Sequence, residues 1–505
     1  MEKEAKTIHS PDVVLGYEQA KALEKIALDV ISSSLTDIFP KEIITVLIGP
    51  WCHTMSHACV SIIQNGVVDE SQKWRPELAP GETIQFMVFS RDHSFYEYLS
   101  NNCDFSKLKI NISTCIIKIP FFIFGKILFF QTGHSKIFFK KLIFSKLFFF
   151  SKLSFKKRIV NYLVSKEQRI RLKMNLCIAL KDFNNSRWIS ERFSEMFPRS
   201  LLEGLPDQKA FYSRPYKFKA IYSSDSWSSL DSFKIFSFSQ RQLRSIKFIG
   251  TPHSLNYSTL NDFWLRNYEL SFLDSYLLWG NFKITASHKC IPFYITKFVG
   301  KKFPKPILGQ SNKIIFSGAA RPSHTIEYPY VCSAFKSYLI DQLDLAQKIS
   351  YLTDSHVVIR TRSKDRGSLL EEIYNTKPML SNVNIEYQDG IFINTLNNYC
   401  LHITDNTSTT ILESFWLNFP TLILIKDDYF NLSKNAFETF TELKKVGIFH
   451  TSGESLLEHL SKIHLNIEEW WCSEQTQNAV QNFLEKHGRG MSDVKIWRNQ
   501  FLRLL

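Results

Sequence analysis

The chain has 505 residues, of which 44% are hydrophobic and 22% are charged, and its formal net charge is +14. This length and this balance predict two or three folded domains with a sizeable core, and they exclude a mainly disordered chain. The positive charge favours a polyanionic partner, such as nucleic acid, anionic lipid or a phosphorylated substrate, although A+T-rich codons enrich lysine in the same way.

The first half of the chain alternates helix and strand patterns. Residues 12–38 have the periodicity of an amphipathic helix, and residues 43–48 form an apolar run that ends at a Gly-Pro pair. We expect this run to be the first strand of an α/β domain, with Gly49, Trp51 and Cys52 lining the cleft beyond its end. Further short strands are expected within residues 83–89, 218–224 and 244–253.

A basic, phenylalanine-rich band lies within this half. No acidic residue occurs between Asp104 and Glu167, and Lys alternates with Phe through much of the stretch. The lysines interrupt every apolar run before it reaches the ~20 residues that a membrane-spanning helix needs. Two interpretations remain open. Residues 118–158 lie on an anionic membrane surface, or the band forms two helices with Phe on the core and Lys in water.

A composition change divides the chain. Residues 300–313 contain prolines, glycines and lysines and are expected to link two domains. After this linker we expect helices over residues 328–348 and 410–418. Strands are expected within residues 313–318, 356–361, 391–396, 400–405 and 420–425.

The sequence therefore predicts an α/β fold with two Rossmann-like, parallel-sheet domains that face a central cleft. The N-terminal domain covers residues 1–300 and carries the basic band as an insertion at about 105–166. The second domain covers residues 301–470, and residues 471–505 are expected to form helices that pack back on the N-terminal domain.

The cysteines indicate the compartment. Nine are present, they are scattered, and none forms a CxxC pair. The N-terminus carries no secretory signal pattern. These features predict a cytoplasmic protein with reduced thiols and without a zinc site.

Residues 403–425, ITDNTSTTILESFWLNFPTLILI, place a cluster of hydroxyl residues where a predicted strand gives way to a helix. The first N–H groups of a helix have no partner within the helix, and the helix dipole adds positive charge, so phosphate binds well there. Glu413 then lies one turn into the helix, where its carboxylate is placed to accept hydrogen bonds from a ribose diol. An alternative needs no ligand, because Thr410 and Glu413 fit the S/T-x-x-E capping box.

Two segments carry a resemblance to known families. DNTSTTILESFWLNFPTLI resembles the D-x-x-S-T-T-x-x-E-x-x-x-x-x-x-P-T segment of glycosyltransferases with the GT-B architecture. GTPHSLNYSTLNDFWLRNYELSFLDSYLLWG, residues 250–280, resembles a signature of transferases from bacterial O-antigen loci. Shorter matches at residues 47–52, 446–460 and 470–501 keep the same order, so the resemblance covers nearly the whole chain.

The second segment also departs from its family. Where the family has Gln-His-Gly-Gly, this chain has Thr-Pro-His-Ser at residues 251–254, so the histidine is offset and two glycines are missing. The letters GTPH are also similar to the H-G-T-P loop of polymer glycerophosphotransferases, which have a related architecture. A second substrate class therefore stays open.

The resemblance implies a GT-B-like fold whose second domain binds a nucleotide and whose first domain is the acceptor side, with Gly49, Trp51 and Cys52 facing the acceptor. In this nucleotide site, Glu413 is expected to hold the ribose. The phosphates are expected to contact Asn406, Ser408, Thr409 and Thr410. Arg360 and Arg321 follow predicted strands and are candidates for further phosphate contacts, because a guanidinium binds phosphate through two hydrogen bonds. Arg360 also fits a surface salt bridge.

Sugar transfer to a hydroxyl needs a group that takes the acceptor proton. His253 is the first candidate, because it lies at a predicted strand end in the family-like segment and imidazole titrates near neutral pH. Asp225, after the strand within residues 218–224, is a weaker candidate for the base. Glu269 lies on a predicted helix and is expected to orient His253 or to cap the next element.

These residues predict a cytoplasmic glycosyltransferase, peripheral on the inner membrane. We expect it to move a sugar from a nucleotide-activated donor, such as a CMP-ulosonate, to a lipid-linked or growing bacterial surface polysaccharide such as O-antigen. GT-B enzymes generally work without metal, so we expect no metal, no cofactor beside the donor, and no nucleic-acid partner. The alternatives are a CDP-alcohol polymer glycerophosphotransferase and a non-catalytic membrane-associated scaffold.

Overall fold

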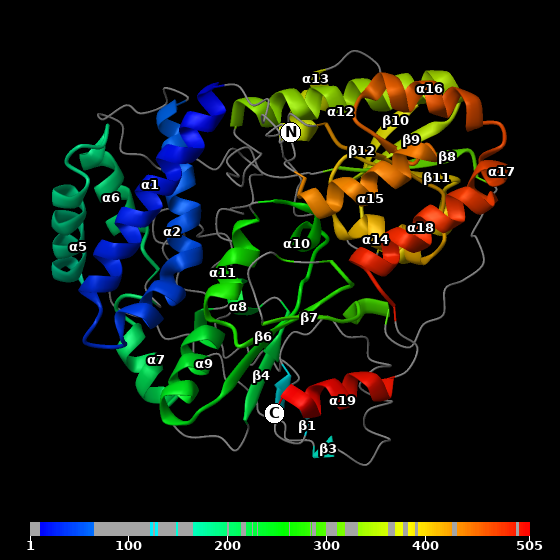
Figure 1. Ribbon diagram of the computed structural model, residues 1–505. Coiled ribbons are helices and arrows are strands. Elements are labelled where there is room, and N and C mark those ends of the chain that lie inside the picture. Colours follow the sequence, from blue (N-terminus) through cyan, green and yellow to red (C-terminus); the bar gives the residue numbers. More distant parts are fainter. Residues whose placement is uncertain are drawn as a thin grey trace, which may run out of the picture.

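The protein forms two α/β units, each built around one sheet (Figure 1). The computed structural model describes residues 11–64, 122–124, 127–129, 148–149, 165–198, 201–213, 219–224, 226–229, 231–261, 263–282, 284, 289–298, 311–318, 332–361, 369–376, 382–388, 392–426, 432–490 and 494–504.

The sheet of the N-terminal unit has the strand order β3-β1-β2-β4-β5-β6-β7 within the described residues. Strands β2, β4, β5, β6 and β7 pair in parallel, whereas β1 pairs antiparallel with β2 and β3. The strands are β1 (Phe122–Phe124), β2 (Ile127–Phe129), β3 (Phe148–Phe149), β4 (Ala220–Ser223), β5 (Lys247–Gly250), β6 (Ser275–Leu278) and β7 (Cys290–Pro292).

Helices surround this sheet, and α1, α2, α5 and α6 gather at the left of Figure 1. They are α1 (Pro11–Ser34), α2 (Lys41–Gln64), α5 (Lys166–Ala179), α6 (Ser186–Met196), α7 (Leu205–Phe211), α8 (Ser226–Ser229), α9 (Asp231–Leu243), α10 (Asn256–Thr259), α11 (Trp264–Phe272) and the 3₁₀ turn η2 (Thr296–Phe298).

The strand expected over residues 43–48 is wrong, because these residues lie inside α2. Pro50 lies within this helix and has no N–H to bond the carbonyl oxygen of Val46. Tyr268 compensates by donating its hydroxyl to that oxygen at 2.8 Å. Buried Lys234 donates to the next carbonyl, that of Leu47, at 2.7 Å. Tertiary partners therefore satisfy the carbonyls near the proline.

The phenylalanine-rich band contributes β1, β2 and β3 to one edge of the N-terminal sheet. The expected helices are therefore wrong for these short segments. The rest of residues 118–158 lies outside the described residues, as do the strand expected within residues 83–89 and most of the linker over residues 300–313. Contact of the band with a membrane stays a prediction.

The sheet of the C-terminal unit is parallel throughout, in the order β10-β9-β8-β11-β12-β13. Numbered within the unit, this is the 3-2-1-4-5-6 order of a Rossmann fold, which reverses direction between β8 and β11 and places a ligand crevice there. The strands are β8 (Lys313–Ser317), β9 (His356–Thr361), β10 (Val383–Tyr387), β11 (Leu401–Thr404), β12 (Thr421–Leu424) and β13 (Phe449–His450).

Helices and 3₁₀ turns complete the second half of the chain. The strand expected over residues 391–396 is wrong, since two 3₁₀ turns occupy residues 392–394 and 396–398. The elements are α12 (Cys332–Thr353), α13 (Leu369–Thr376), η4 (Phe392–Asn394), η5 (Leu396–Asn398), α14 (Thr409–Trp416), α15 (Lys434–Lys445), α16 (Gly453–Ile463), α17 (Ile467–Cys472), α18 (Glu474–His487) and α19 (Val494–Leu504).

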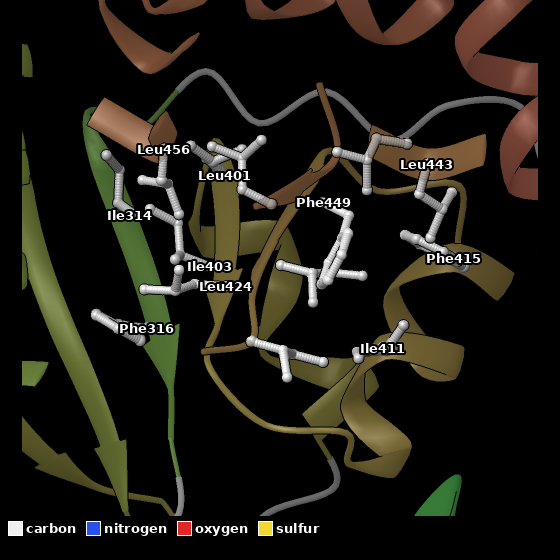
Figure 2. Packing of buried hydrophobic residues seen from close by; sticks show 14 of the residues in the cluster. Ile314, Phe316, Leu401, Ile403, Ile411, Phe415, Leu424, Leu443, Phe449 and Leu456 are labelled. Atoms are coloured by element: carbon white, nitrogen blue, oxygen red, sulfur yellow. The ribbon is translucent and has the colours of Figure 1, made fainter. Parts of the chain in front are cut away.

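The C-terminal unit has its own hydrophobic core (Figure 2). Strand residues Ile314, Leu401 and Ile403 pack with Phe415 of α14 and Leu456 of α16. All five side chains are fully buried. This core fixes α14, and hence the hydroxyl-rich loop before it, against the carboxyl ends of the strands.

The last helices connect both units. Gly280, after β6, lies so close to α18 that a Cβ atom there would meet the carbonyl oxygen of Lys486. In α19, Trp497 packs edge-on against Phe293, and Phe501 packs edge-on against Tyr222 of β4. The C-terminal helices thus contact the N-terminal unit.

Strand pairing confirms the expected α/β, GT-B-like architecture of two mainly parallel-sheet domains. Every helix in the described part of the chain is too short or too polar to cross a lipid bilayer.

Candidate active site at the domain interface

His253 follows β5 and takes part in a chain of hydrogen bonds. Its Nδ1 atom lies 3.0 Å from the carbonyl oxygen of Ser224 and 3.2 Å from the hydroxyl oxygen of Tyr257. Tyr257 donates to one carboxylate oxygen of Glu269 at 3.0 Å, and Tyr276 donates to the other at 2.9 Å. Burial, followed by the negative charge of Glu269, raises the pKa of Tyr276 well above its usual value, so this hydroxyl keeps its proton.

This chain of hydrogen bonds determines which nitrogen of His253 is free for chemistry. A carbonyl oxygen only accepts, so Nδ1 carries the proton that it donates to Ser224. In the neutral imidazole, Nε2 then holds the lone pair and can take a proton from a hydroxyl. Fully buried Glu269 stabilises the resulting positive charge through Tyr257. Asp225, the third predicted catalytic residue, lies outside the described residues.

The hydroxyl-rich loop of the C-terminal unit leads into α14. Ser408 is the N-cap, because its Oγ accepts from the backbone N–H of Thr410 at 3.3 Å. The Oγ1 atom of Thr410 lies 2.5 Å from Ser408 Oγ. The capping box expected from Thr410 and Glu413 is therefore wrong, since the cap lies two residues earlier. Ser408, Thr409 and Thr410 are half-buried at the positive end of this helix.

A buried histidine is connected to this loop through hydrogen bonds. His402 of β11 lies between two hydroxyl groups, with Nε2 2.7 Å from Ser317 Oγ and Nδ1 3.0 Å from Ser414 Oγ. Ser317 Oγ also lies 3.3 Å from Thr410 Oγ1. Burial, assisted by the charge of Arg360, lowers the pKa of His402 to about 3, so the ring is neutral. Hydrogen bonds among uncharged groups thus link β8, β11 and α14.

Asn406, in the same loop, is buried, and its side-chain oxygen has no hydrogen-bond partner within the described residues. A buried acceptor in this state costs about 1–3 kcal/mol. The loop therefore has an acceptor to offer to a ligand.

Two polar contacts bring the two units together at this loop. Thr407 donates its hydroxyl to the side-chain oxygen of Asn256 at 2.7 Å, and Asn256 lies three residues after His253. Lys297 of η2 forms an ion pair with Glu413, whose side chain is only 4% exposed. The structure thus brings the segment of His253 next to the predicted nucleotide loop, and Glu413 lies between the units with Lys297 as its partner.

Arg360 lies near the carboxyl end of β9, at the same edge of the sheet as the hydroxyl-rich loop. It pairs in register with Ser317 of β8, which in turn pairs with Thr404 of β11. Its guanidinium lies over the ring of Phe392 and donates to the carbonyl oxygen of Gln388 at 3.3 Å. Arg321 lies outside the described residues.

The three residues expected on the acceptor side lie in α2 and pack inward. Cys52 is fully buried in the core, so it does not line a cleft. Trp51 packs edge-on against Phe193 and Phe197, with ring centroids 5.3 and 4.7 Å apart. A Cβ atom on Gly49 would lie 3.2 Å from the Tyr268 ring, so the glycine permits close packing of α2 on α11.

A family model of transferases matches residues 30–502. The chain belongs to the LIC12162 family of transferases. A search of curated protein sequences finds no match.

Solved structures with some likeness to this transferase have low identity. MurG of Acinetobacter baumannii is 11% identical over 68% of this chain and 81% of its own, with a TM-score of 0.32. The spinosyn rhamnosyltransferase SpnG is 11% identical over 66% of this chain and 82% of its own, with a TM-score of 0.34. A Thermobaculum terrenum O-GlcNAc transferase mutant is 13% identical over 58% and 60% of the two chains, with a TM-score of 0.30. Likenesses at this level say nothing about the substrate.

The transferase also has functional candidates that sequence reasoning missed. A cavity of about 150 Å³ lies between α12 and α16, lined by Tyr338, Gln342, Lys348, Asp405 and Lys426 among others. Asp405 accepts from Tyr338 Oη at 2.6 Å and from Gln342 Nε2 at 3.0 Å. Because Asp405 precedes the hydroxyl-rich loop directly, the cavity adjoins the predicted nucleotide site.

The sequence held a signal for only some of these residues. Tyr257 lies four residues after His253, a spacing that brings side chains together on a helical turn. Lys297 and Tyr338 carry no such signal, because their partners are more than 60 residues away in the chain.

Proposed function

We propose that this transferase is a glycosyltransferase that uses a nucleotide-activated sugar. The contact between Thr407 and Asn256 supports the proposal most directly, because it holds a helix N-terminus suited to phosphate beside a segment with an oriented histidine. Leaving-group stabilisation and proton removal are the two functions that sugar transfer requires. The start of α14, in the C-terminal unit, is suited to the first function, and His253, in the N-terminal unit, is suited to the second.

The roles follow from the geometry of the two sides. His253 Nε2 takes the proton of the acceptor hydroxyl. At the same time the oxygen of that hydroxyl forms a bond to the anomeric carbon of the donor sugar. The bond from that carbon to the phosphate oxygen breaks, and the nucleotide leaves with both electrons. The N–H groups at the start of α14, with Ser408, Thr409 and Thr410, stabilise the negative charge that develops on the phosphate. Basic residues and the helix dipole supply the positive field, so the step proceeds without metal.

For the substrates we propose those that the resemblance implies. The donor is a nucleotide sugar such as a CMP-ulosonate, and the acceptor is a lipid-linked or growing surface polysaccharide such as O-antigen. The transferase works at the cytoplasmic face of the inner membrane, with residues 118–158 on anionic lipid, and it has no nucleic-acid partner. The net charge of +14 supports an anionic partner but does not choose among them.

The test begins with nucleotide binding. The purified chain is titrated by calorimetry and thermal shift with CMP, CDP, UDP, GDP and dTDP, without and with Mg²⁺. We expect one nucleotide to stabilise the protein selectively and Mg²⁺ to have no effect. A protein that none of the five stabilises would overturn the proposal.

A variant pair then tests the base. His253→Asn should keep the affinity for the selected nucleotide and lower the transfer rate by about 10²–10⁴-fold. His464→Gln, which changes a histidine after α16, is the control and should behave as the wild type. A product that retains phosphate after CMP release would instead identify a CDP-alcohol phosphotransferase.

A further inference from the structure

A group of metal-ligating side chains lies outside the candidate active site, between α1 and α2. It consists of Glu24 on α1 and of His53 and His57 on α2. One nitrogen of each imidazole and one carboxylate oxygen all lie within 4.8 Å of one another. The two histidines are four residues apart on one helix, a spacing that places both on the same face.

The group is already partly organised. His53 Nδ1 lies 2.9 Å from Glu24 Oε2, and the side chains of these two residues are only 7% and 13% exposed. The indole N–H of Trp264 donates to the other oxygen of Glu24 at 3.2 Å. The Trp264 ring also stacks on His53, with centroids 4.0 Å apart. Both the carboxylate and the first imidazole are therefore oriented by a neighbour, as ligands of metal sites commonly are.

His57 provides a second and independent observation. It is 3% exposed, and its Nε2 atom is buried without a hydrogen-bond partner in the described part of the chain. Two other buried histidines, His402 and His487, have a partner at each ring nitrogen. A buried ring nitrogen without a partner costs free energy, and a metal ion would satisfy it.

We propose that Glu24, His53 and His57 bind one divalent transition-metal ion of the class of Zn²⁺. Two imidazoles and one carboxylate are a ligand set that such ions take, with bond lengths of about 2.0–2.2 Å and a fourth position for water. Lys21 lies close enough to act on His57 electrostatically and opposes a cation, whereas the carboxylate of Glu24 offsets that charge. The ion would join α1 to α2 beside Trp264 of α11, the helix that carries Glu269.

This site does not rest on the proposed transfer reaction, and it differs from the expectation of a metal-free chain. The competing explanation is a cluster held by hydrogen bonds alone, in which Glu24 pairs with His53 and no ion binds. The two explanations differ in the stoichiometry of metal binding, which is measurable without a substrate.

The experiment is a calorimetric titration of the full chain with Zn²⁺ after metal removal by a chelator. A parallel titration with Co²⁺ monitors the visible absorption that imidazole ligands give. We expect one equivalent of either ion to bind and Co²⁺ to develop bands of a site with nitrogen ligands. Binding of no equivalent by the wild type would overturn the proposal, whatever the variants do.

Matched variants locate the ion. His57→Gln and Glu24→Gln should each weaken Zn²⁺ binding at least about tenfold, whereas Glu42→Gln, which changes an exposed carboxylate in the first turn of α2, should bind as the wild type. Trp264→Phe keeps an aromatic ring but removes the N–H to Glu24, and it should weaken binding about tenfold even if His57→Gln fails to fold. Wild-type affinity in the His57, Glu24 and Trp264 variants would overturn the assignment.

Discussion

At the scale of single residues, Asp405 shows how burial links the C-terminal unit to pH. Its carboxyl group is 6% exposed and has Tyr338 and Gln342 as hydrogen-bond donors. Burial raises its pKa from an ordinary 3.8 to about 7, although both donors act in the opposite direction. The folded protein therefore holds a proton here that the unfolded chain has already released.

This difference in proton binding gives a prediction for stability. Between the unfolded pKa near 4 and the folded pKa near 7, the folded state binds more protons, so stability falls as pH rises, by up to about 1.4 kcal/mol per pH unit. Asp405→Asn removes this contribution. Urea unfolding at about pH 5 and about pH 6.5 should show a larger loss for the wild type than for the variant.

The control for this prediction is Asp344→Asn, which removes a half-buried carboxylate from the wall of the same cavity. It leaves Asp405 in place, so its loss of stability with pH should match that of the wild type. Equal pH dependence in the wild type and in Asp405→Asn would contradict the raised pKa.

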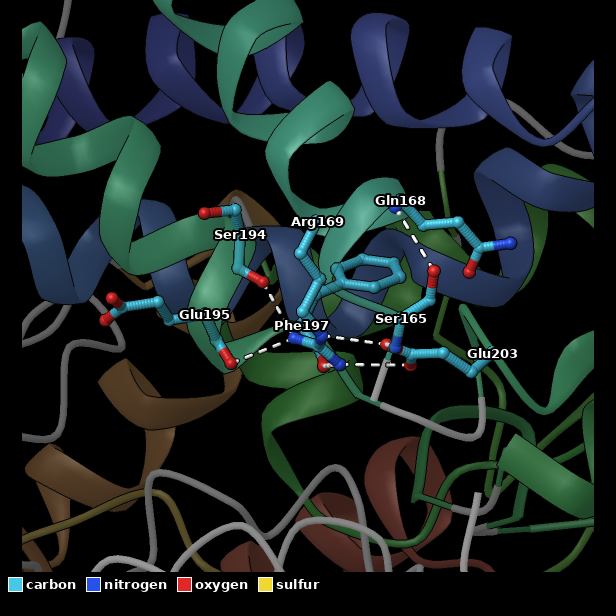
Figure 3. Close-up of polar contacts among 7 residues, drawn as sticks. All are labelled: Ser165, Gln168, Arg169, Ser194, Glu195, Phe197 and Glu203. Carbon is cyan, nitrogen blue, oxygen red and sulfur yellow. Dashed lines mark hydrogen bonds and ion pairs between the residues drawn. The ribbon is translucent and has the colours of Figure 1, made fainter. Parts of the chain in front are cut away.

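At the scale of elements, one arginine fixes the corner where α6 meets the start of α5 (Figure 3). Arg169 of α5 donates to the carbonyl oxygens of Ser194, Glu195 and Phe197 at 2.7 to 3.0 Å. It also forms a two-pronged ion pair with Glu203 at 2.8 and 3.0 Å, and both side chains are nearly buried. The planar guanidinium is suited to this set of acceptors.

Arg169→Met should lower the free energy of unfolding by about 3–5 kcal/mol, because it leaves the carboxylate of Glu203 buried without its partner. The matched control is Lys173→Met, one turn further along α5, which removes an ion pair with Glu191 that is about one-third exposed. Its cost should be within about 0–1 kcal/mol. Urea unfolding measures both, and similar losses in the two variants would contradict the role of Arg169.

The sequence predicted four of the six strands of the C-terminal sheet, β8, β9, β11 and β12, because these are short, mostly buried apolar runs, and it did not predict β10 and β13. It failed over residues 43–48 because the partners that let a helix continue past Pro50, Tyr268 and Lys234, lie about 190 to 220 residues later. Reading this run as a strand also hid the helical spacing of His53 and His57.

The error over residues 391–396 has a different cause. Phe392, Leu396 and Tyr399 are buried together in a small cluster with Ile315 and Val358. Their spacing of four and three residues is helical, so the sequence contained the correct period, and the short run of apolar letters obscured it.

At the scale of the whole molecule, a side chain of the N-terminal unit packs into the core of the C-terminal unit, and backbone groups of the two units form hydrogen bonds. Leu255, two residues after His253, belongs to the hydrophobic core of the C-terminal unit. The backbone N–H of Ser433 donates to the carbonyl oxygen of Thr259 at 2.7 Å. Contacts of this kind depend on the docked arrangement of two domains, so residue patterns in one chain segment do not reveal them. The sequence suggested both halves of the candidate site, whereas only the structure showed that they meet.

The pair of Lys297 and Glu413 allows ribose binding and domain contact to be separated. Glu413→Gln and Lys297→Met each break the ion pair, but only the first removes the carboxylate. If Glu413 holds the ribose of the proposed donor, Glu413→Gln should weaken nucleotide binding about tenfold, or about 1.4 kcal/mol, and Lys297→Met should not weaken it. Lys297→Met should instead lower the free energy of unfolding by about 1–3 kcal/mol, since it leaves a buried carboxylate without its cation.

Calorimetry with the nucleotide that stabilises the wild type, together with urea unfolding, measures both effects. Glu458→Gln is the control, because it breaks an exposed ion pair with Lys462 within α16 of the C-terminal unit and should change neither quantity. Equal nucleotide affinity in the wild type and in Glu413→Gln would assign Glu413 to domain contact alone. Equal weakening in Glu413→Gln and Lys297→Met would mean that the nucleotide depends on the docked arrangement of the domains, and that the carboxylate acts by holding Lys297.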